Sequence, residues 1–220
     1  MTQFAFHWPV TSSHSPLDFI VSSSNAQAVD FLESWPDGKN SIALLSGPQA
    51  SGKTHLIQGW ILRTEATVID KTMLGKALST EFWNKASHAV LEDIQTVTDE
   101  TALFHLLRHA ESHQLTLLLT SSLPAPEFPC SLPDLKSRLL ALPAITIAPP
   151  DEILLHGYVM KYFSDHQLRV HEDVIHYLVR RTERSFTALL CLLERIEKTS
   201  IETKRDITIP LIKPLVEKTV

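Results

Sequence analysis

The chain has 220 residues and a mass of 24.7 kDa, and 44% of its residues are hydrophobic and 20% charged. It can therefore bury roughly 70% of its unfolded surface as one large or two small domains, which excludes wholesale disorder, a collagen-like repeat and a disulfide-stapled miniprotein. The net charge of −5 argues against a protein whose whole surface clamps nucleic acid, because phosphate binding depends on clustered Lys and Arg.

The sequence shows no sign of secretion or membrane insertion. It has no basic start followed by an apolar signal core, and no stretch approaches ~20 uninterrupted apolar residues. We therefore expect a cytoplasmic protein with no membrane partner. Cys130 and Cys191 lie in no CxxC spacing, which favours two reduced, buried thiols. The eleven histidines show no convergent ligand spacing, so we expect packed or surface imidazoles rather than a histidine metal centre.

Helix and strand patterns alternate through the first two thirds of the chain. Residues 1 to about 17 have no periodicity and read as a tail. Apolar periodicity then predicts helices over 25–35, 53–63, 73–79 and 99–113, the last with Thr98 as its N-cap. Short apolar runs predict strands over 41–46, 67–70, 89–91, 115–120 and 145–147. Five such strands separated by helices indicate a parallel sheet covered on both faces.

The pattern changes at Pro149-Pro150, after which no strand signal remains. Apolar stripes at helical spacing run through 154–162, 174–179 and 186–196. We therefore predict a flexible N-terminal tail over 1–17, an α/β domain over 18–149 and a small helical lid domain over 150–220.

The segment from 47 to 54 fits the phosphate-binding pattern G-x-x-x-x-G-K-[ST] and reads Gly47-Pro48-Gln49-Ala50-Ser51-Gly52-Lys53-Thr54. It follows a buried strand and opens a helix, as the mechanism requires, so that backbone N–H groups and the helix N-terminus face an anion. In such loops the lysine reaches the β- and γ-phosphates and the hydroxyl ligates Mg²⁺. The sequence therefore predicts a site for ADP or ATP with Mg²⁺.

Two adjacent carboxylates, Glu92 and Asp93, end the strand that lies about 40 residues after Lys53. In P-loop ATPases of this spacing the first acidic residue holds the Mg²⁺ shell and the next polarises the attacking water. Two acids at a strand end are common, so a catalytic role for this pair is favoured only because the phosphate loop precedes it. We assign Glu92, with Thr54, to the metal and Asp93 to catalysis.

Several further stretches carry a family resemblance. They are 17–25, the phosphate loop, Leu91-Glu92-Asp93-Ile94-Gln95, the strand 117–122, Leu132-Pro133-Asp134-Leu135-Lys136-Ser137-Arg138-Leu139 and the ending Asp206-Ile207-Thr208-Ile209-Pro210. In these the chain resembles the P-loop AAA+ domain of the replication initiator DnaA, and more closely the Hda group of regulatory inactivators of DnaA. The resemblance covers nearly the whole chain and implies an AAA+ fold with a five-stranded parallel sheet and a helical lid.

The resemblance also implies partners and site residues. Arg138 is similar to an arginine finger presented in trans to the γ-phosphate of a DnaA partner, and Arg184 stands near the position of a lid arginine that contacts the cofactor. In the tail, Gln3, Phe4 and Phe6 are similar to the family's motif for the DNA polymerase III sliding clamp (β subunit). Full-length initiators carry a DNA-binding domain after the lid, and the end of this sequence at Val220 leads us to expect none here.

Three departures from the family pattern affect hydrolysis. Glu92 stands where DnaA usually has Asp, Ser122 stands at the sensor position of its strand, and Thr187 stands at the lid arginine position, one turn after Arg184. We therefore expect nucleotide binding with weak or no ATPase activity of the chain itself.

These features favour a nucleotide-bound regulator that promotes hydrolysis of DnaA-bound ATP, together with the DNA-loaded clamp, and so limits re-initiation. An AAA+ ATPase acting as a helicase or clamp loader is the alternative. A P-loop phosphotransferase is a weaker one, because a kinase usually has an arginine-rich lid over the phosphates and the arginines of this lid cluster only at Arg180, Arg181 and Arg184. The sequence leaves open whether ADP or ATP is the working ligand and whether the chain forms a homo-oligomer.

Overall fold

A computed structural model describes residues 20–36, 41–75, 80–83 and 86–217. Its five strands form one parallel sheet in the order β2-β3-β4-β1-β5. The strands are β1 (Ile42–Ser46), β2 (Thr67–Val68), β3 (His88–Leu91), β4 (Thr116–Ser121) and β5 (Ala144–Thr146). The predicted α/β fold with a five-stranded parallel sheet is thus confirmed.

Burial explains which strands occupy the centre of the sheet. Every residue of β1 and β4 is buried, as are the last three residues of β3. Such strands read as continuous apolar runs because both of their faces are covered. The edge strands β2 and β5 are shorter and partly exposed, so their sequence signal is weaker.

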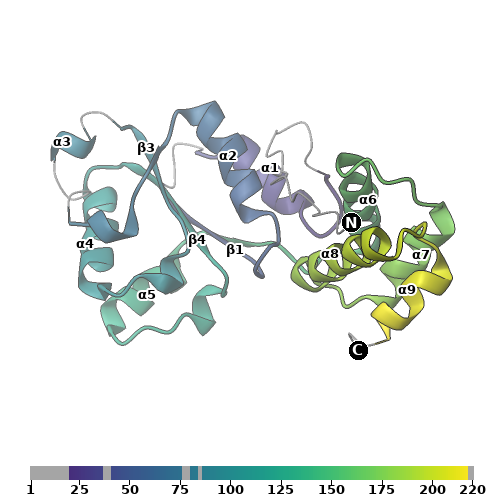
Figure 1. Cartoon of the computed structure of the whole chain (residues 1–220). Coiled ribbons are helices and arrows are strands. Elements are labelled where there is room, and N and C mark those ends of the chain that lie inside the picture. Colours follow the sequence, from purple (N-terminus) through teal and green to yellow (C-terminus); the bar gives the residue numbers. More distant parts are fainter. Residues whose placement is uncertain (1–19, 37–40, 76–79, 84–85, 218–220) are drawn as a thin grey trace, which may run out of the picture.

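Helices cover both faces of the sheet (Figure 1). Alternate residues of β1 point to opposite faces, Ile42 and Leu44 into one apolar cluster and Ala43 and Leu45 into another. The first cluster is completed by α4 (Glu100–Ser112) and α5 (Pro133–Ala141), and the second by α1 (Ala26–Ser34) and α2 (Lys53–Thr64). This two-sided packing fixes the carboxyl ends of β1, β3 and β4 side by side.

The C-terminal third of the chain is helical and has its own apolar core. It consists of α6 (Glu152–Asp165), α7 (Glu172–Arg181), α8 (Phe186–Thr203) and α9 (Ile209–Val216), which pack together at one end of the molecule (Figure 1). The apolar stripes predicted the first three of these helices. They did not predict α9, which contains Pro210 in its first turn and Pro214 inside it, because proline normally argues against a helix interior.

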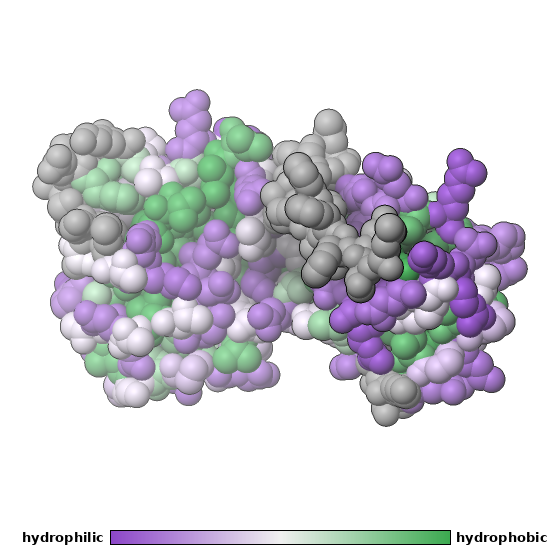
Figure 2. Space-filling view, viewed as in Figure 1, coloured by the Kyte–Doolittle hydropathy of each residue, from purple (hydrophilic) through white to green (hydrophobic). Residues whose placement is uncertain are grey.

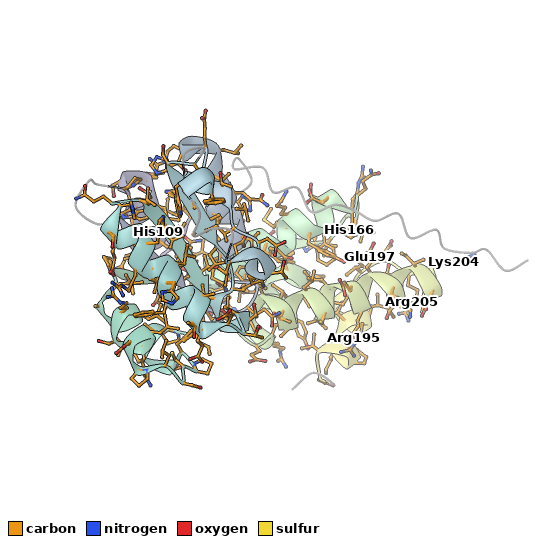
Figure 3. The ribbon with its side chains drawn as sticks, turned by 90° about the vertical axis from the view of Figure 1, so that its left-hand side faces the viewer. His109, His166, Arg195, Glu197, Lys204 and Arg205 are labelled. Carbon is orange, nitrogen blue, oxygen red and sulfur yellow. The ribbon has the colours of Figure 1, made fainter. Side chains whose placement is uncertain are left out.

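A polar network joins two lid helices. The Tyr162 hydroxyl donates to Glu197 Oε2 at 2.7 Å, and His166 Nδ1 lies 2.9 Å from Glu197 Oε1. Figure 3 shows His166 and Glu197 next to each other where α6 meets α8. Burial and the neighbouring Glu197 carboxylate raise the pKa of the Tyr162 hydroxyl well above its usual range, so this group stays a donor.

One local prediction was wrong and another was wrong at its first residues, and each has a local cause. Asp99, not Thr98, caps α4, because its side chain accepts the N–H of Ala102 at 2.8 Å. The helix predicted over 73–79 is not formed at 74–75, where the chain turns, and residues 76–79 lie outside the described residues. Just before that stretch, Asp70 accepts the N–H of Thr72 at 2.9 Å and starts a 3-10 turn. The helix α3 lies further on, at Thr80–Trp83.

The thiol prediction also needs correction. Both cysteines are free, but Cys130 is half-buried and Cys191 is exposed. Within the described ranges, no helix has the length and apolar character needed to cross a membrane. The view in Figure 2 shows hydrophobic surface gathered over α2 and the strands beside it, and Leu62 of α2 and Val68 of β2 are among the exposed apolar residues.

Candidate nucleotide-binding site

The loop from Gly47 to Gly52 joins the carboxyl end of β1 to the N-terminus of α2. It is anchored at its start, where the Gly47 N–H donates to Ser121 O at the end of β4 at 3.1 Å. Ala50 and Gly52 have positive φ angles of 61° and 90°, which curl the backbone back toward the helix. No side chain caps α2 at Gly52. The first-turn N–H groups of this 12-residue helix and the positive end of its dipole are therefore available to an anion.

The loop is packed so tightly that glycine is required at its first position. A Cβ on Gly47 would lie 2.9 Å from Ser51 Oγ and 3.0 Å from Ile147 Cβ. The hydroxyl of Ser51 is buried and has no hydrogen-bond partner among the described residues. A buried, unpartnered hydroxyl is costly, and a bound phosphate is one group that would satisfy it.

Lys53 is buried, with 7% of its surface exposed. Its Nζ donates to the carbonyl oxygens of Gly47 at 2.7 Å and Pro48 at 2.8 Å. Burial lowers the pKa of the Lys53 amine from its ordinary value, and the negative charges of Asp93 and Glu92 oppose that shift without cancelling it. A buried ammonium held by neutral carbonyls is poorly compensated, so the site favours an anionic ligand.

The two predicted carboxylates do lie beside the loop. Thr54 Oγ1 donates to Glu92 Oε2 at 3.3 Å, so the two proposed Mg²⁺ ligands are adjacent in space. Asp93 adopts a left-handed conformation with φ 52°, and its N–H donates to Thr120 Oγ1 of β4 at 2.9 Å. The structure thus brings Lys53, Thr54, Glu92 and Asp93 together at the carboxyl ends of β1, β3 and β4.

Gln95 is a residue whose position the sequence did not reveal. Its Nε2 donates to Asp93 Oδ1 at 3.2 Å, and its Oε1 accepts the N–H of Ser122 at 3.2 Å. It therefore links the Asp93 carboxylate to the backbone of Ser122 at the end of β4. The pairing of β3 with β4 creates this bridge, and no local sequence signal could have indicated it.

Arg184 and Thr187 lie in the lid. Arg184 is in the loop between α7 and α8, about two-thirds exposed, with Nη2 3.6 Å from Glu152 Oε1 of α6. Thr187 is exposed in the first turn of α8. Among the described residues, the ion-pair partner of Arg184 thus belongs to the lid itself rather than to the phosphate loop.

Arg138 lies on α5 and contacts α4. It forms an ion pair with Glu111, and its guanidinium lies 5.3 Å from the centroid of the Phe104 ring. The start of α5 is fastened to the same helix, because the Glu100 carboxylate accepts the N–H groups of Ser131 at 3.0 Å and Leu132 at 2.8 Å. About a third of the Arg138 side chain is exposed.

The segment that precedes α1 contacts both the sheet and the lid. Ser23 Oγ donates to Asp151 Oδ2 at 2.7 Å, next to α6, and the Ala148 N–H donates to Ser24 O at 3.0 Å. The segment therefore spans the connection between β5 and α6. The predicted clamp motif, Gln3, Phe4 and Phe6, lies outside the described residues.

Comparisons with known proteins bear on the fold and on the lid. A family model described as "Hda, lid domain" matches residues 162–216. An uncharacterised protein of Haemophilus influenzae is 26% identical over 196 residues, covering 81% of this chain and 83% of the relative. Domain III of the Thermotoga maritima initiation protein DnaA superposes with a TM-score of 0.75 at 17% identity, covering 97% of this chain and 99% of that one. AMPPCP-bound DnaA from Aquifex aeolicus gives 0.67 at 19% identity, covering 88% and 68%.

Proposed function

We propose that this chain, whose lid matches the Hda lid model and whose fold is that of DnaA domain III, is a nucleotide-bound regulator of replication initiation. In this proposal it docks on ATP-bound DnaA and promotes hydrolysis of the ATP held by that partner. The proposal also divides the chain into a tail over 1–17, a nucleotide-binding domain over 18–149 and a lid domain over 150–220. The Hda lid match at 162–216 and the separate apolar core of α6 to α9 support this division.

The observation that carries the proposal is the placement of the two key cations. Lys53 is buried inside the phosphate loop, whereas Arg138 pairs with Glu111 of α4 and remains partly exposed. A guanidinium offers planar, bidentate contacts to phosphate. An arginine that is held on α4 and α5 and still accessible suits a neighbour's site, and arginine fingers supplied in trans contribute about 10³–10⁵ in rate.

The chain's own site fits ADP or ATP. The loop formed by Gly47, Pro48, Gln49, Ala50, Ser51 and Gly52 would surround the phosphates. The backbone N–H groups of its non-proline residues would face them, because Pro48 has no N–H to donate. Lys53 would exchange its two carbonyl acceptors for phosphate oxygens. Thr54 and Glu92 would hold Mg²⁺, which neutralises phosphate charge when bound. Support comes from the unpartnered Ser51 hydroxyl, the contact between Thr54 and Glu92, and the AMPPCP bound to a DnaA of the same fold.

Weak hydrolysis by the chain itself is part of the proposal. Asp93 is the candidate base, but its carboxylate already accepts a hydrogen bond from Gln95. Ser122 supplies no acid at the sensor position, and Arg184 pairs with Glu152 of α6. We therefore expect this site to bind nucleotide but to hydrolyse it slowly.

We assign clamp binding to Gln3, Phe4 and Phe6. Two apolar anchors at alternate positions, preceded by a hydrogen-bonding Gln, suit an extended peptide in a groove of the sliding clamp. Tethering to a clamp on newly replicated DNA would raise the effective concentration of the regulator near its target.

A second candidate is an AAA+ loader or initiator-like ATPase. The juxtaposition of Lys53, Thr54, Glu92 and Asp93 favours it, since these residues form the set that P-loop ATPases use for hydrolysis. In the first candidate the hydrolysed ATP is bound to DnaA, whereas in the second it is bound to this chain.

The test is to add the purified protein to ATP-bound DnaA in the presence of DNA-loaded clamp and to follow conversion of the bound ATP to ADP. The regulator predicts faster conversion on DnaA, dependence on the clamp, and little ATPase activity without DnaA. Rapid ATP turnover by the protein alone, with no effect on DnaA, would instead establish the loader.

A further inference from the structure

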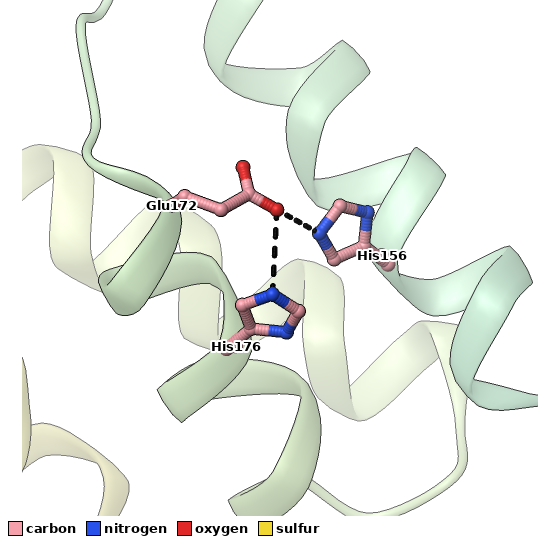
Figure 4. Close-up of side chains that lie close together, drawn as sticks. All are labelled: His156, Glu172 and His176. Atoms are coloured by element: carbon pink, nitrogen blue, oxygen red, sulfur yellow. Dashed lines mark hydrogen bonds and ion pairs between the residues drawn. The ribbon is translucent and has the colours of Figure 1, made fainter.

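Three side chains with metal-ligating atoms converge on the surface of the lid, far along the chain from the phosphate loop. His156 comes from α6, and Glu172 and His176 lie one turn apart at the start of α7. Figure 4 shows the Glu172 carboxylate between the two imidazoles, with the Nε2 atoms of both rings directed at the same oxygen. One ligand atom from each residue lies within 4.8 Å of the other two. Two of the eleven histidines thus converge in space with a carboxylate, which the sequence analysis did not expect.

The spacing of these atoms is close to that of a metal site. His156 Nε2 lies 2.6 Å and His176 Nε2 3.5 Å from Glu172 Oε1. In a tetrahedral zinc site with metal–ligand distances of about 2.0–2.1 Å, the ligand atoms lie roughly 3.3 Å apart. The observed separations bracket this value, so rotamer adjustments of the three side chains would admit an ion.

The chemistry of the three ligands limits the ion. Two neutral imidazoles and one carboxylate suit zinc and its neighbours among the late first-row metals, whereas Mg²⁺ and Ca²⁺ prefer all-oxygen sites. The single negative charge of Glu172 would neutralise part of the charge of a divalent cation. About a quarter of His156 and about half of both Glu172 and His176 are exposed, so an ion could enter from solvent and keep water as a fourth ligand.

We propose that His156, Glu172 and His176 form a binding site for a divalent cation of the zinc class, which clips α6 to α7. The three ligands come from two helices that already pack against each other through the lid core. An ion bound by both helices stabilises the folded lid, because ligands gathered by folding bind the metal better than separated ones. None of the three ligands is among the residues assigned above to nucleotide, to DnaA or to the clamp.

The experiment uses the full-length protein, without a histidine tag, after removal of metal with a chelator. Zn²⁺ is titrated by calorimetry at pH 7, and Co²⁺ is added to a second sample to record its visible spectrum. We expect one strongly bound Zn²⁺ per chain, a spectrum of tetrahedral Co²⁺, and a higher midpoint of thermal unfolding with Zn²⁺. Loss of a residue that only hydrogen-bonds a metal ligand lowers metal affinity about 10–100-fold. His156→Gln and His176→Gln each remove a ligand itself, so each should lower the affinity for Zn²⁺ by more than that.

A matched control is available on α4. The rings of His109 and His113 lie with centroids 4.2 Å apart, and they form a second histidine pair that could bind Zn²⁺ adventitiously. The double variant His109→Gln, His113→Gln should leave the strong site intact. Loss of binding in this control, retention of binding in both lid variants, or no strong binding by the wild type would overturn the proposal.

A folding defect can be told apart from the loss of a ligand. Each lid variant is first compared with the wild type in thermal unfolding without metal. If a histidine variant is unstable without metal, Glu172→Gln serves in its place, because it keeps both imidazoles and the shape of the side chain while removing the anionic ligand. Binding of Zn²⁺ by Glu172→Gln as tightly as by the wild type would contradict the assigned ligand set.

Discussion

Replacing Lys53 with Met separates ligand binding from folding. Met keeps most of the length and the apolar stem of the side chain but removes the ammonium that donates to Gly47 O and Pro48 O. A hydrogen bond to a charged group contributes about 1.5–3 kcal/mol. Affinity for ADP and ATP should therefore fall about 10- to 150-fold, since about 1.4 kcal/mol corresponds to a factor of ten.

The same change should affect the stability of the nucleotide-free protein little at neutral pH. Two carbonyls lose a donor, at a cost of about 1–3 kcal/mol each if they are left without a partner, but a buried charge is also removed. Because the pKa of Lys53 is lowered in the folded state, the unfolded chain binds more protons in the alkaline range. The free energy of unfolding of the wild type should therefore rise as pH increases from the folded pKa toward the ordinary value of 10.5, and Lys53→Met should lack this rise.

Calorimetric titration with ADP and ATP measures the affinities, and chemical denaturation between pH 7 and pH 10 measures the stability. Lys71→Met is the matched control, because Lys71 is exposed and donates to Thr96 Oγ1 at 2.9 Å. It should leave both quantities unchanged. Undiminished affinity of Lys53→Met for both nucleotides would mean that the loop does not hold phosphate, and the reasoning about the site would fail.

Three further predictions follow from other contacts. Gly47→Ala should lower nucleotide affinity and the free energy of unfolding, because the added Cβ has no room. Gly59→Ala in α2, where nothing lies within 4 Å of the added Cβ, should raise the free energy of unfolding by about 0.5–1 kcal/mol in denaturation experiments. Equal effects of the two changes would contradict the tight packing around Gly47. Glu111→Gln releases Arg138 from its ion pair. It should therefore keep or raise the stimulation of DnaA and change the free energy of unfolding by about 0–1 kcal/mol. Loss of stimulation in the hydrolysis assay would mean that the ion pair positions Arg138. Backbone N–H groups lower the pKa of Glu100, so the contribution of its carboxylate to stability is lost as pH falls below about 4.5. The difference in unfolding free energy between the wild type and Glu100→Gln should therefore narrow in acid. A difference that stays constant would refute this role of the Glu100 carboxylate.

Local signals predicted the parts of the fold that local physics determines. The continuous apolar runs of β1 and β4 predicted buried parallel strands, and the loop 47–54 predicted a strand–loop–helix unit, because each pattern acts within a few residues. The helix predicted over 73–79 is absent at 74–75 for a reason that is also local, since Asp70 accepts the N–H of Thr72 and the chain turns there. The proline-containing α9 was missed because its stability comes from Leu211, Ile212 and Val216 packed in the lid.

Contacts between distant segments could not be predicted in the same way. The bridge made by Gln95 depends on the register of β3 against β4, and the pairing of Arg138 with Glu111 depends on the packing of α5 on α4. The lid cluster was partly visible, because Glu172 and His176 are four residues apart on one helix face. Its third member, His156, required knowledge of how α6 packs on α7.

The most direct test of the central claim is hydrolysis of DnaA-bound ATP with an Arg138→Ala variant. The control is Arg108→Ala, which removes an exposed arginine from α4, and both variants are first shown to bind ADP as the wild type does. If Arg138 serves a partner's site, Arg138→Ala loses stimulation of DnaA with the clamp present while its own nucleotide affinity is unchanged, and Arg108→Ala stimulates normally. Full stimulation by Arg138→Ala would contradict the account.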